Sequence, residues 1–368
     1  MKIKKILKWS FLTILVALGG WLFIAYWTST NDCERMTASP SNPMKAITSC
    51  EYGVDNLKVQ EIEKPTPADN EVLVHVRAAS VNPVDGHMIR DSWLGRLLGG
   101  LRKPKNTRFG TDFAGVVEAV GKNVTEFKPG DEVFGAKNGA VAESICVKAE
   151  RAIAIKPTNI TFEQAGSVGV AGITALQGLR DQGHIKPGQK VLINGASGGV
   201  GTFAVQIAKA LGAEVTAVCS TRNVDLVKSV GADHVIDYTK EDFTRTDQRY
   251  DMIYDLVGNH GFSERRNILT PNGICVLAGI GGAGAHPETM GRIVGNFWNA
   301  FRSNFSKQKF VFYIAKLTKD DFGVLHDLMQ SGKVSPVIDR TYKFEQTADA
   351  VRYMEEGHAR GKVVVVID

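Results

Sequence analysis

A glycine-rich run near the middle of the chain has the spacing of a diphosphate-binding loop. It follows a predicted strand at 191–194 and leads into a predicted helix at about 200–211. Glycines permit a tight turn and let backbone N–H groups at a helix N-terminus approach a phosphate. A second predicted strand at 214–219 completes the context in which such a motif binds a dinucleotide. The loop, with G-x-x-G-x-x-G spacing, consists of Gly195, Ala196, Ser197, Gly198, Gly199, Val200 and Gly201.

The residues after the second of these strands favour NADPH over NADH. A site for NADH usually has Asp or Glu about 20 residues beyond the loop, where the carboxylate accepts from the ribose hydroxyls. Here the strand is followed by Ser220 and Arg222, and the first acid is Asp225. A hydroxyl and a guanidinium suit a 2′-phosphate, which accepts charge-assisted hydrogen bonds. The alternative is that Arg222 is merely solvated. The sequence therefore predicts NADPH as the cofactor.

The elements that must position this loop fall into three blocks. Residues 44–156 form short apolar runs separated by turns, such as the turn within 128–135, and predict a β-rich domain. From 157 to 315 strands alternate with helices, which is the pattern of a parallel doubly wound sheet. The remaining residues predict a helix, a strand and an amphipathic helix, and they end in a β-branched run at 362–367 that is typical of a buried strand. The fold class is α/β.

The N-terminal residues 1–30 have the pattern of a membrane anchor. Four lysines occur within residues 1–8, and the 19 residues from Trp9 to Trp27 carry no charge. As a helix this stretch would span roughly 28 Å, close to the hydrocarbon core of a bilayer. Aromatic residues lie at both of its ends, as they do at membrane interfaces. A cleaved signal sequence or a buried helix is the alternative. Residues 31–43 are expected to be a polar linker.

Length and composition exclude several classes of protein. The 368 residues carry 44 Lys and Arg against 39 Asp and Glu, with 43% apolar and 23% charged residues. These values exclude a disordered chain, a collagenous repeat and a multi-pass membrane protein. The net charge of +5 gives no reason to expect nucleic-acid binding. Five cysteines are too few for a disulfide scaffold, and we expect all five to be unpaired, as in a reducing compartment.

The side of the membrane is a point on which the sequence signals conflict. The lysine-rich N-terminus should stay in the cytoplasm, and a simple single span would then place the body on the other side. Free NADPH and unpaired cysteines favour the cytoplasm or an organelle matrix. We therefore expect the body on the NADPH side, with the helix inserted in the inverted orientation or lying in the interface.

Motifs along nearly the whole body resemble one known superfamily. They include A-S-V-N-P-V-D (79–85), F-G-T-D-F-A-G-V-V (109–117), K-P-G-D-E-V-F-G (128–135), G-I-T-A-L-Q-G-L (172–179), the glycine-loop stretch 188–209, G-A-D-H-V-I-D-Y (231–238) and G-K-V-V-V-V (361–366). On these motifs residues 44–368 resemble the medium-chain dehydrogenase/reductase superfamily. The chain is most similar to its zinc-independent quinone oxidoreductase branch, which includes zeta-crystallin-like and reticulon-interacting reductases. The resemblance implies a GroES-like catalytic domain at 44–157, completed by 317–368, and a Rossmann NADP-binding domain at 158–316.

The same resemblance implies roles for individual residues in a cleft between the two domains. Asn82 and Asp85 would line the nicotinamide and substrate end, although Asp85 could instead cap a helix that begins near Pro83. His87 is a further candidate proton donor. The other implied cofactor residues are Thr174, Ser220, Arg222, Tyr238, Val257, Gly279, Ile280, Gly281 and Lys362. For Tyr238 the alternative is simple packing beside a loop.

The positions where zinc members of the superfamily carry ligands have other residues here. They read Asn82-Pro83-Val84-Asp85 and Thr111-Asp112, and the five cysteines are far apart. We therefore expect no metal, and hydride transfer from NADPH to a quinone or an α,β-unsaturated carbonyl, whose electrophilic carbon needs mainly positioning. The alternatives are a zinc-type alcohol dehydrogenase and a membrane-anchored NADPH-binding protein without turnover. The segment 291–305 could be a helix that contacts a membrane surface or gates a lipophilic substrate, and the alternative is a helix packed on the sheet edge or at a dimer interface. A predicted strand at 309–314 would be the last of its sheet.

Overall fold

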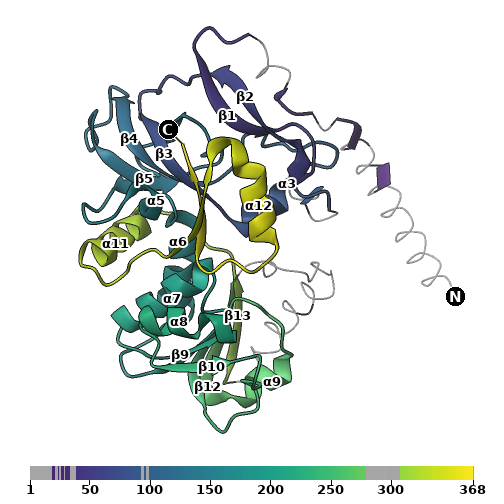
Figure 1. Cartoon of the computed structure of the whole chain (residues 1–368), viewed down its shortest axis with the longest axis vertical. Helices are drawn as coiled ribbons and strands as arrows, with labels where there is room; N and C mark the ends of the chain where they lie inside the picture. Colours follow the sequence, from purple (N-terminus) through teal and green to yellow (C-terminus); the bar gives the residue numbers. More distant parts are fainter. Residues whose placement is uncertain are drawn as a thin grey trace, which may run out of the picture.

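The computed structural model describes residues 19–20, 24, 26–28, 30–33, 39–92, 95–96, 99–278, 295 and 307–367. Most of the predicted anchor at 9–27 lies outside this part of the chain, as do the turn 279–281 and all of the segment 291–305 except Gly295. Within the described ranges, no helix combines the length and apolar character needed to span a bilayer. The described body contains two large sheets, one above the other in Figure 1, with helices between and beside them.

The lower sheet in Figure 1 is the predicted parallel sheet. Its six strands lie in the order β10-β9-β8-β11-β12-β13, and every neighbouring pair is parallel. The chain order reverses between β8 and β11, and in open sheets of this kind ligands bind beyond the carboxyl ends of the strands at that point. The bounds are β8 Lys190–Asn194, β9 Glu214–Cys219, β10 His234–Asp237, β11 Tyr250–Asp255, β12 Leu269–Ala278 and β13 Lys309–Tyr313.

The upper sheet contains strands from both ends of the body. Seven strands form it, in the order β14-β15-β3-β4-β5-β7, with β6 paired to β3. The strand β15 lies between β14 and β3, so a segment near residue 365 joins the sheet to which β3 belongs. A separate two-stranded sheet pairs β1 with β2. The bounds are β1 Pro43–Ser49, β2 Leu57–Glu63, β3 Glu71–Val81, β4 Asp112–Val120, β5 Glu132–Ala136, β6 Ser144–Lys148, β7 Ile153–Ile155, β14 Ile338–Lys343 and β15 Lys362–Val366.

Helices connect and cover these sheets. α7 follows β8 directly and opens the crossover to β9, as the sequence predicted. α6 continues into a π-helical turn at Gly178–Gln182. The helix bounds are α3 Pro83–Ile89, α5 Phe162–Ala165, α6 Gly169–Gln177, α7 Gly199–Ala210, α8 Val224–Ser229, α9 Phe262–Asn267, α11 Lys319–Gln330 and α12 Thr347–Glu355. The α/β fold with a sequence-split β-rich domain and a Rossmann-type domain is thus confirmed.

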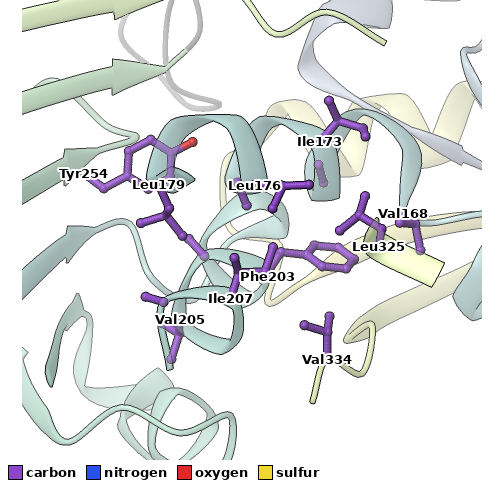
Figure 2. Packing of buried hydrophobic residues seen from close by; sticks show 14 of the residues in the cluster. Val168, Ile173, Leu176, Leu179, Phe203, Val205, Ile207, Tyr254, Leu325 and Val334 are labelled. Carbon is purple, nitrogen blue, oxygen red and sulfur yellow. The ribbon is translucent and has the colours of Figure 1, made fainter. Parts of the chain in front are cut away.

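One apolar core joins the two large sheets. It includes Phe134 of β5, Phe203 of α7 and Phe322 of α11, all fully buried. Figure 2 shows the ring of Phe203 directed toward Leu325 of α11. A Cβ atom at Gly172 of α6 would lie only 3.1 Å from the Leu325 side chain, so α6 and α11 approach closely because this position lacks a side chain. The C-terminal segment is therefore packed against the nucleotide-binding half.

The cysteine pattern corrects one expectation. Cys33 and Cys50 form a disulfide, with their Cα atoms 5.8 Å apart, so the prediction of five unpaired cysteines is wrong. Cys146, Cys219 and Cys275 are free and buried. The two partners lie 17 positions apart, and no sequence pattern indicated that they would pair. Cys33 belongs to the predicted linker, which is consequently fastened to the body at this point.

The shared core generates a stability prediction at α11. Leu325 is fully buried, so Leu325→Ala removes several methyl and methylene groups and leaves a cavity. We expect a loss of about 2–5 kcal/mol in the free energy of unfolding. The neighbouring Val324 on the same helix is 37% exposed, and Val324→Ala is the matched control, with an expected loss below about 1 kcal/mol. Urea unfolding measures both, and equal losses for the two variants would contradict the shared core.

Candidate active site

The glycine loop closes the end of β8 onto the start of α7. Gly195 has a φ of +86°, a conformation that residues with a side chain rarely adopt. A Cβ atom at Gly201 would collide with the Gly195 carbonyl oxygen and the Ala196 backbone, so α7 can begin this close to the strand only with glycine here. The first backbone N–H groups of the 12-residue helix α7 are thereby placed at the carboxyl edge of the sheet. This arrangement can hold a diphosphate.

A buried asparagine joins this loop to the end of β9. Asn223 Nδ2 lies 2.9 Å from Ser197 Oγ and 3.2 Å from Ser220 Oγ, donating to both hydroxyls. Its own Oδ1 is buried and has no hydrogen-bond partner within the described structure. An orphaned acceptor next to two hydroxyls is expected where a polar ligand completes the hydrogen bonding. The residues present therefore fit a bound dinucleotide at this edge.

Two arginines meet beside the predicted adenosine end. Arg222 Nη2 donates to the His358 carbonyl oxygen at 2.9 Å, and Arg360 Nη2 donates to the Arg222 carbonyl oxygen at 3.3 Å. His358 and Arg360 belong to the turn before β15, a strand of the upper sheet. Arg360 therefore adds a second guanidinium next to Arg222. Tyr238 follows β10 and is 58% exposed. The edge near Ser220 is thus cationic and open to solvent.

A buried polar cluster lies where the two halves meet. Lys362 Nζ donates to Asn82 Oδ1 and is 3.5 Å from Asp112 Oδ2. Asn82 Nδ2 donates to the same Asp112 oxygen at 3.0 Å. The side chain of Lys362 also passes over the glycine loop, since a Cβ atom at Gly199 would be 3.1 Å from Lys362 Cδ. Lys362 therefore connects the loop to the V-N-P-V-D motif.

Asp85 is a second carboxylate beside Asn82, whose Nδ2 donates to Asp85 Oδ2 at 3.3 Å. The Asn82 backbone N–H donates to Asp85 Oδ2 at 2.8 Å, and Thr111 Oγ1 donates to Asp85 Oδ1 at 2.6 Å. The first of these contacts caps α3, which is the alternative role that the sequence left open for Asp85. Burial raises the pKa of Asp85 to about 6, against the lowering effect of the Thr111 hydrogen bond. Burial likewise lowers the pKa of Lys362, while Asp112 and Asp85 act to raise it.

Asp112 anchors the cluster to both halves. Its Oδ2 accepts from Ser80 Oγ at 2.9 Å, and its Oδ1 accepts from the Val170 backbone N–H of α6 at 2.7 Å. A Cβ atom at Gly169 would collide with this carboxylate, so α6 begins against Asp112 only because that position is glycine. Sequence reasoning gave Asp112 no role beyond its place in a motif, because its partners are distant in the chain.

The remaining predicted residues are placed around this centre. The Thr174 hydroxyl donates to the Val170 carbonyl within α6, and the Thr174 carbonyl accepts from the buried Tyr254 and Tyr313 hydroxyls. The Val257 backbone N–H donates to Asp255 Oδ1 at 3.1 Å. His87 lies half-buried on α3. The positions of Gly279, Ile280 and Gly281 lie outside the described residues.

A buried ion pair holds the loop after β11. Arg265 Nη1 and Asp255 Oδ2 are 2.7 Å apart, and both side chains are buried. Asp255 Oδ1 accepts in addition from Asn194 Nδ2 at 2.9 Å and from the Gly258 N–H at 2.8 Å. These contacts fix the turn that carries Val257 beside Gly195. The sequence did not single out Asp255, Arg265 or Asn223, because each acts through residues on other elements.

No metal centre is visible in the described part of the chain. Within it, no three His, Cys, Asp or Glu side chains gather in a way that could hold a metal ion. Burial raises the pKa of Cys146 and of Cys219 to about 11 and that of Cys275 to about 12, which disfavours the thiolate form that binds zinc. Zinc independence stays a prediction, and it is tested below.

The raised pKa of Asp85 predicts a pH dependence of stability. A carboxyl that is more easily protonated in the folded state stabilises the fold below its ordinary pKa of 3.8, and that stabilisation is lost as the pH rises through about 6. Asp85→Asn removes this titration. Its Oδ1 can still accept from the Asn82 N–H and its Nδ2 can donate to Thr111, so the cap is kept. From pH 4 to pH 7 the variant should gain up to about 3 kcal/mol relative to the wild type.

Unfolding by urea at several pH values measures this difference. The exposed Asp247, changed to Asn, is the control and should follow the wild type. An Asp85→Asn profile parallel to that of the wild type would show that Asp85 is ionised in the fold without penalty.

Two family models match the chain. One described as an alcohol dehydrogenase GroES-like domain matches residues 68–206, and one described as a zinc-binding dehydrogenase matches residues 230–365. The mitochondrial NAD(P)H oxidoreductase RTN4IP1 of Mus musculus is 33% identical, covering 89% of this chain and 90% of its own length. The chloroplastic NADPH-dependent alkenal/one oxidoreductase of Arabidopsis thaliana is 34% identical, over 92% of this chain and 83% of its own.

Solved structures agree with these matches. The quinone oxidoreductase of Coxiella burnetii superposes with a TM-score of 0.76 at 28% identity, covering 89% of this chain and 100% of that one. The family models match segments of both large sheets, and the first of them includes the glycine loop. The chain belongs to the medium-chain dehydrogenase/reductase superfamily.

Proposed function

We propose that this protein is an NADPH-dependent oxidoreductase that reduces a quinone or an α,β-unsaturated carbonyl without a metal. The observation that carries the proposal is the position of Lys362, which lies over Gly199 of the glycine loop and donates to Asn82. This contact brings the cofactor loop and the cleft motif to one place. Relatives named as alkenal/one, furanone and quinone oxidoreductases support the substrate class.

Residues from both halves of the body would bind the cofactor. The backbone from Gly195 to Gly201 holds the diphosphate, and Ser220 with Arg222 receives the 2′-phosphate. Arg360 adds its guanidinium from the turn before β15. When bound, NADPH supplies the hydride. Asn82 and Lys362 then fix the polar environment in which developing negative charge on the substrate oxygen is stabilised.

The buried cluster gives this environment its rigidity. Asn82 is held through both side-chain atoms, by Lys362 at Oδ1 and by Asp112 at Nδ2. Because these contacts exist before any substrate arrives, orienting them costs nothing during the reaction. Asp85 supports the same residue through the cap of α3. We assign Asp85 and Asp112 as positioning residues, since their hydrogen bonds go to other protein groups.

The proposal also includes the domain boundaries, a membrane anchor and a homodimer. Residues 158–316 would be the Rossmann domain, and 44–157 with 317–368 the GroES-like domain, in keeping with the two large sheets. Residues 9–27 would anchor the chain in a membrane, which suits a lipophilic substrate. β13 ends the parallel sheet among the described strands, so a second copy could pair with its edge in a homodimer. Membrane extraction and the solution mass of the detergent-solubilised protein test the last two.

Turnover is the direct test of the function. Purified full-length protein should oxidise NADPH with a panel of quinones and enones and should be inactive with simple alcohols and NADP⁺. Activity should survive a strong chelator, and elemental analysis should find no stoichiometric zinc. Stoichiometric zinc with loss of activity on chelation would favour an alcohol dehydrogenase, and NADPH binding without turnover would favour a binding protein.

Cofactor choice should depend on the two arginines at the adenosine end. A hydrogen bond to a charged group contributes about 1.5–3 kcal/mol, so Arg222→Ala should weaken NADPH binding roughly ten- to a hundredfold. Arg360→Ala should weaken it in the same direction, because its guanidinium lies next to Arg222. NADH has no phosphate there, and its affinity should hardly change in either variant.

Dissociation constants at fixed ionic strength measure this selectivity. Arg249 directly precedes β11 and so lies at the amino end of that strand, whereas the glycine loop lies at the carboxyl end of β8. Arg249→Ala is therefore the control and should bind both cofactors like the wild type. An unchanged ratio of NADPH to NADH affinity in Arg222→Ala would contradict the proposed phosphate site.

A further inference from the structure

The residues just before β1 are fastened to the body at three points. Cys33 is bonded to Cys50, Asn31 Nδ2 donates to the Cys50 carbonyl at 2.9 Å, and Thr107 Oγ1 donates to Asp32 Oδ1 at 2.6 Å. We call Asn31, Asp32 and Cys33 the N-terminal strap. Cys33 and Thr107 are buried, so these contacts are part of the packed structure. The strap is therefore a fixed attachment and not a free tether.

The attachment points are themselves joined to each other. The Ser49 backbone N–H donates to the Thr107 carbonyl at 2.7 Å. This hydrogen bond joins the residue before Cys50 to Thr107, which holds Asp32 of the strap. Trp27 and Cys33 are six positions apart, and a fully extended chain of that length spans at most about 20 Å. The end of the uncharged stretch consequently lies within about 20 Å of the body. Arg102 of the body lies 5.4 Å from the centre of the Trp27 ring, which shows that the contact extends to this residue.

The distribution of cysteines separates the strap from the rest of the chain. Three cysteines are free and buried, and burial raises the pKa of each thiol; they are Cys146, Cys219 and Cys275. Such thiols react slowly with oxidants. Cys33 and Cys50 form the single disulfide among the described residues. Its formation takes two electrons and two protons from the two thiols and passes them to a disulfide-bearing thiol oxidoreductase, which becomes a dithiol. Such oxidants act outside the cytoplasm.

The charges at the N-terminus lead to the same side independently. Lys2, Lys4, Lys5 and Lys8 precede the uncharged stretch, and positive residues flanking a span stay in the cytoplasm. Residues that follow Trp27 then emerge on the other side. In the sequence analysis, the expectation of five unpaired cysteines was an argument against this orientation. The Cys33–Cys50 disulfide removes that argument.

We propose that the catalytic body lies on the non-cytoplasmic side of the membrane, and that the Cys33–Cys50 disulfide of the strap holds it against that surface. The proposal rests on the membrane anchor proposed above. It reverses the expected placement on the cytoplasmic side. It also requires that the oxidised cofactor be reduced again to NADPH in the same compartment by an NADP⁺-reducing dehydrogenase, because a highly charged dinucleotide does not cross a bilayer unaided.

Thiol counting on the full-length protein tests the disulfide. Membranes from expressing cells are denatured with an alkylating reagent and no reductant, and the mass of the intact chain is measured. We expect three alkylated cysteines without reduction and five after it. Cys33→Ser should expose the thiol of Cys50 and give four, whereas the control Cys146→Ser should leave the disulfide intact and give two. Five alkylated cysteines in the unreduced wild type would overturn the proposal.

Protease protection on sealed vesicles tests the side. External protease should digest the body in vesicles whose non-cytoplasmic face is outward and should leave it intact in vesicles whose cytoplasmic face is outward. The opposite pattern would overturn the proposed side, and a chain released from membranes by carbonate would overturn the anchor on which it rests. NADPH turnover with enones is assayed separately in detergent, so failure of the proposed reaction is distinguishable from failure of the proposed location.

Discussion

The buried ammonium group of Lys362 is the interaction on which the site depends. It lies between the carboxylate of Asp112, the side-chain oxygen of Asn82 and the glycine loop. A buried charge is tolerated only when it is paired and hydrogen-bonded, and removing one partner of such a group leaves the others uncompensated. Lys362 therefore requires Asp112 and Asn82 together, and they in turn require α6 and α3 to begin where they do.

This requirement explains why the chain must return to its first sheet. β15 delivers Lys362 from the C-terminal segment, β3 leads to Asn82, and β4 begins with Asp112. Antiparallel pairing of β3 with β15 and with β4 brings these strand ends together. The same cluster reaches the other half through the Val170 N–H of α6 and through Gly199 of α7. The active site is thus a consequence of pairing between distant strands, and no single motif contains it.

The sequence predicted the local features of this protein well and the long-range ones poorly. The glycine loop, the strands around it and the split β-rich domain follow from spacing, hydrophobic pattern and resemblance, which are properties of contiguous residues. Asp112, Asn223 and Arg360 acquire their roles from partners on other elements, and the Lys362–Asn82 pair is separated by 280 positions. The disulfide between Cys33 and Cys50 was missed for the same reason, since composition alone gives no pairing. Such contacts are decided by tertiary packing.

The packing of α11 against α6 limits the motions by which this enzyme can admit and release ligands. Because Leu325, Gly172 and Phe203 belong to one close-packed core, the two halves cannot swing apart as rigid bodies without opening that core to water. A ligand bound between them must therefore enter and leave by movement of surface segments and not by hinge opening.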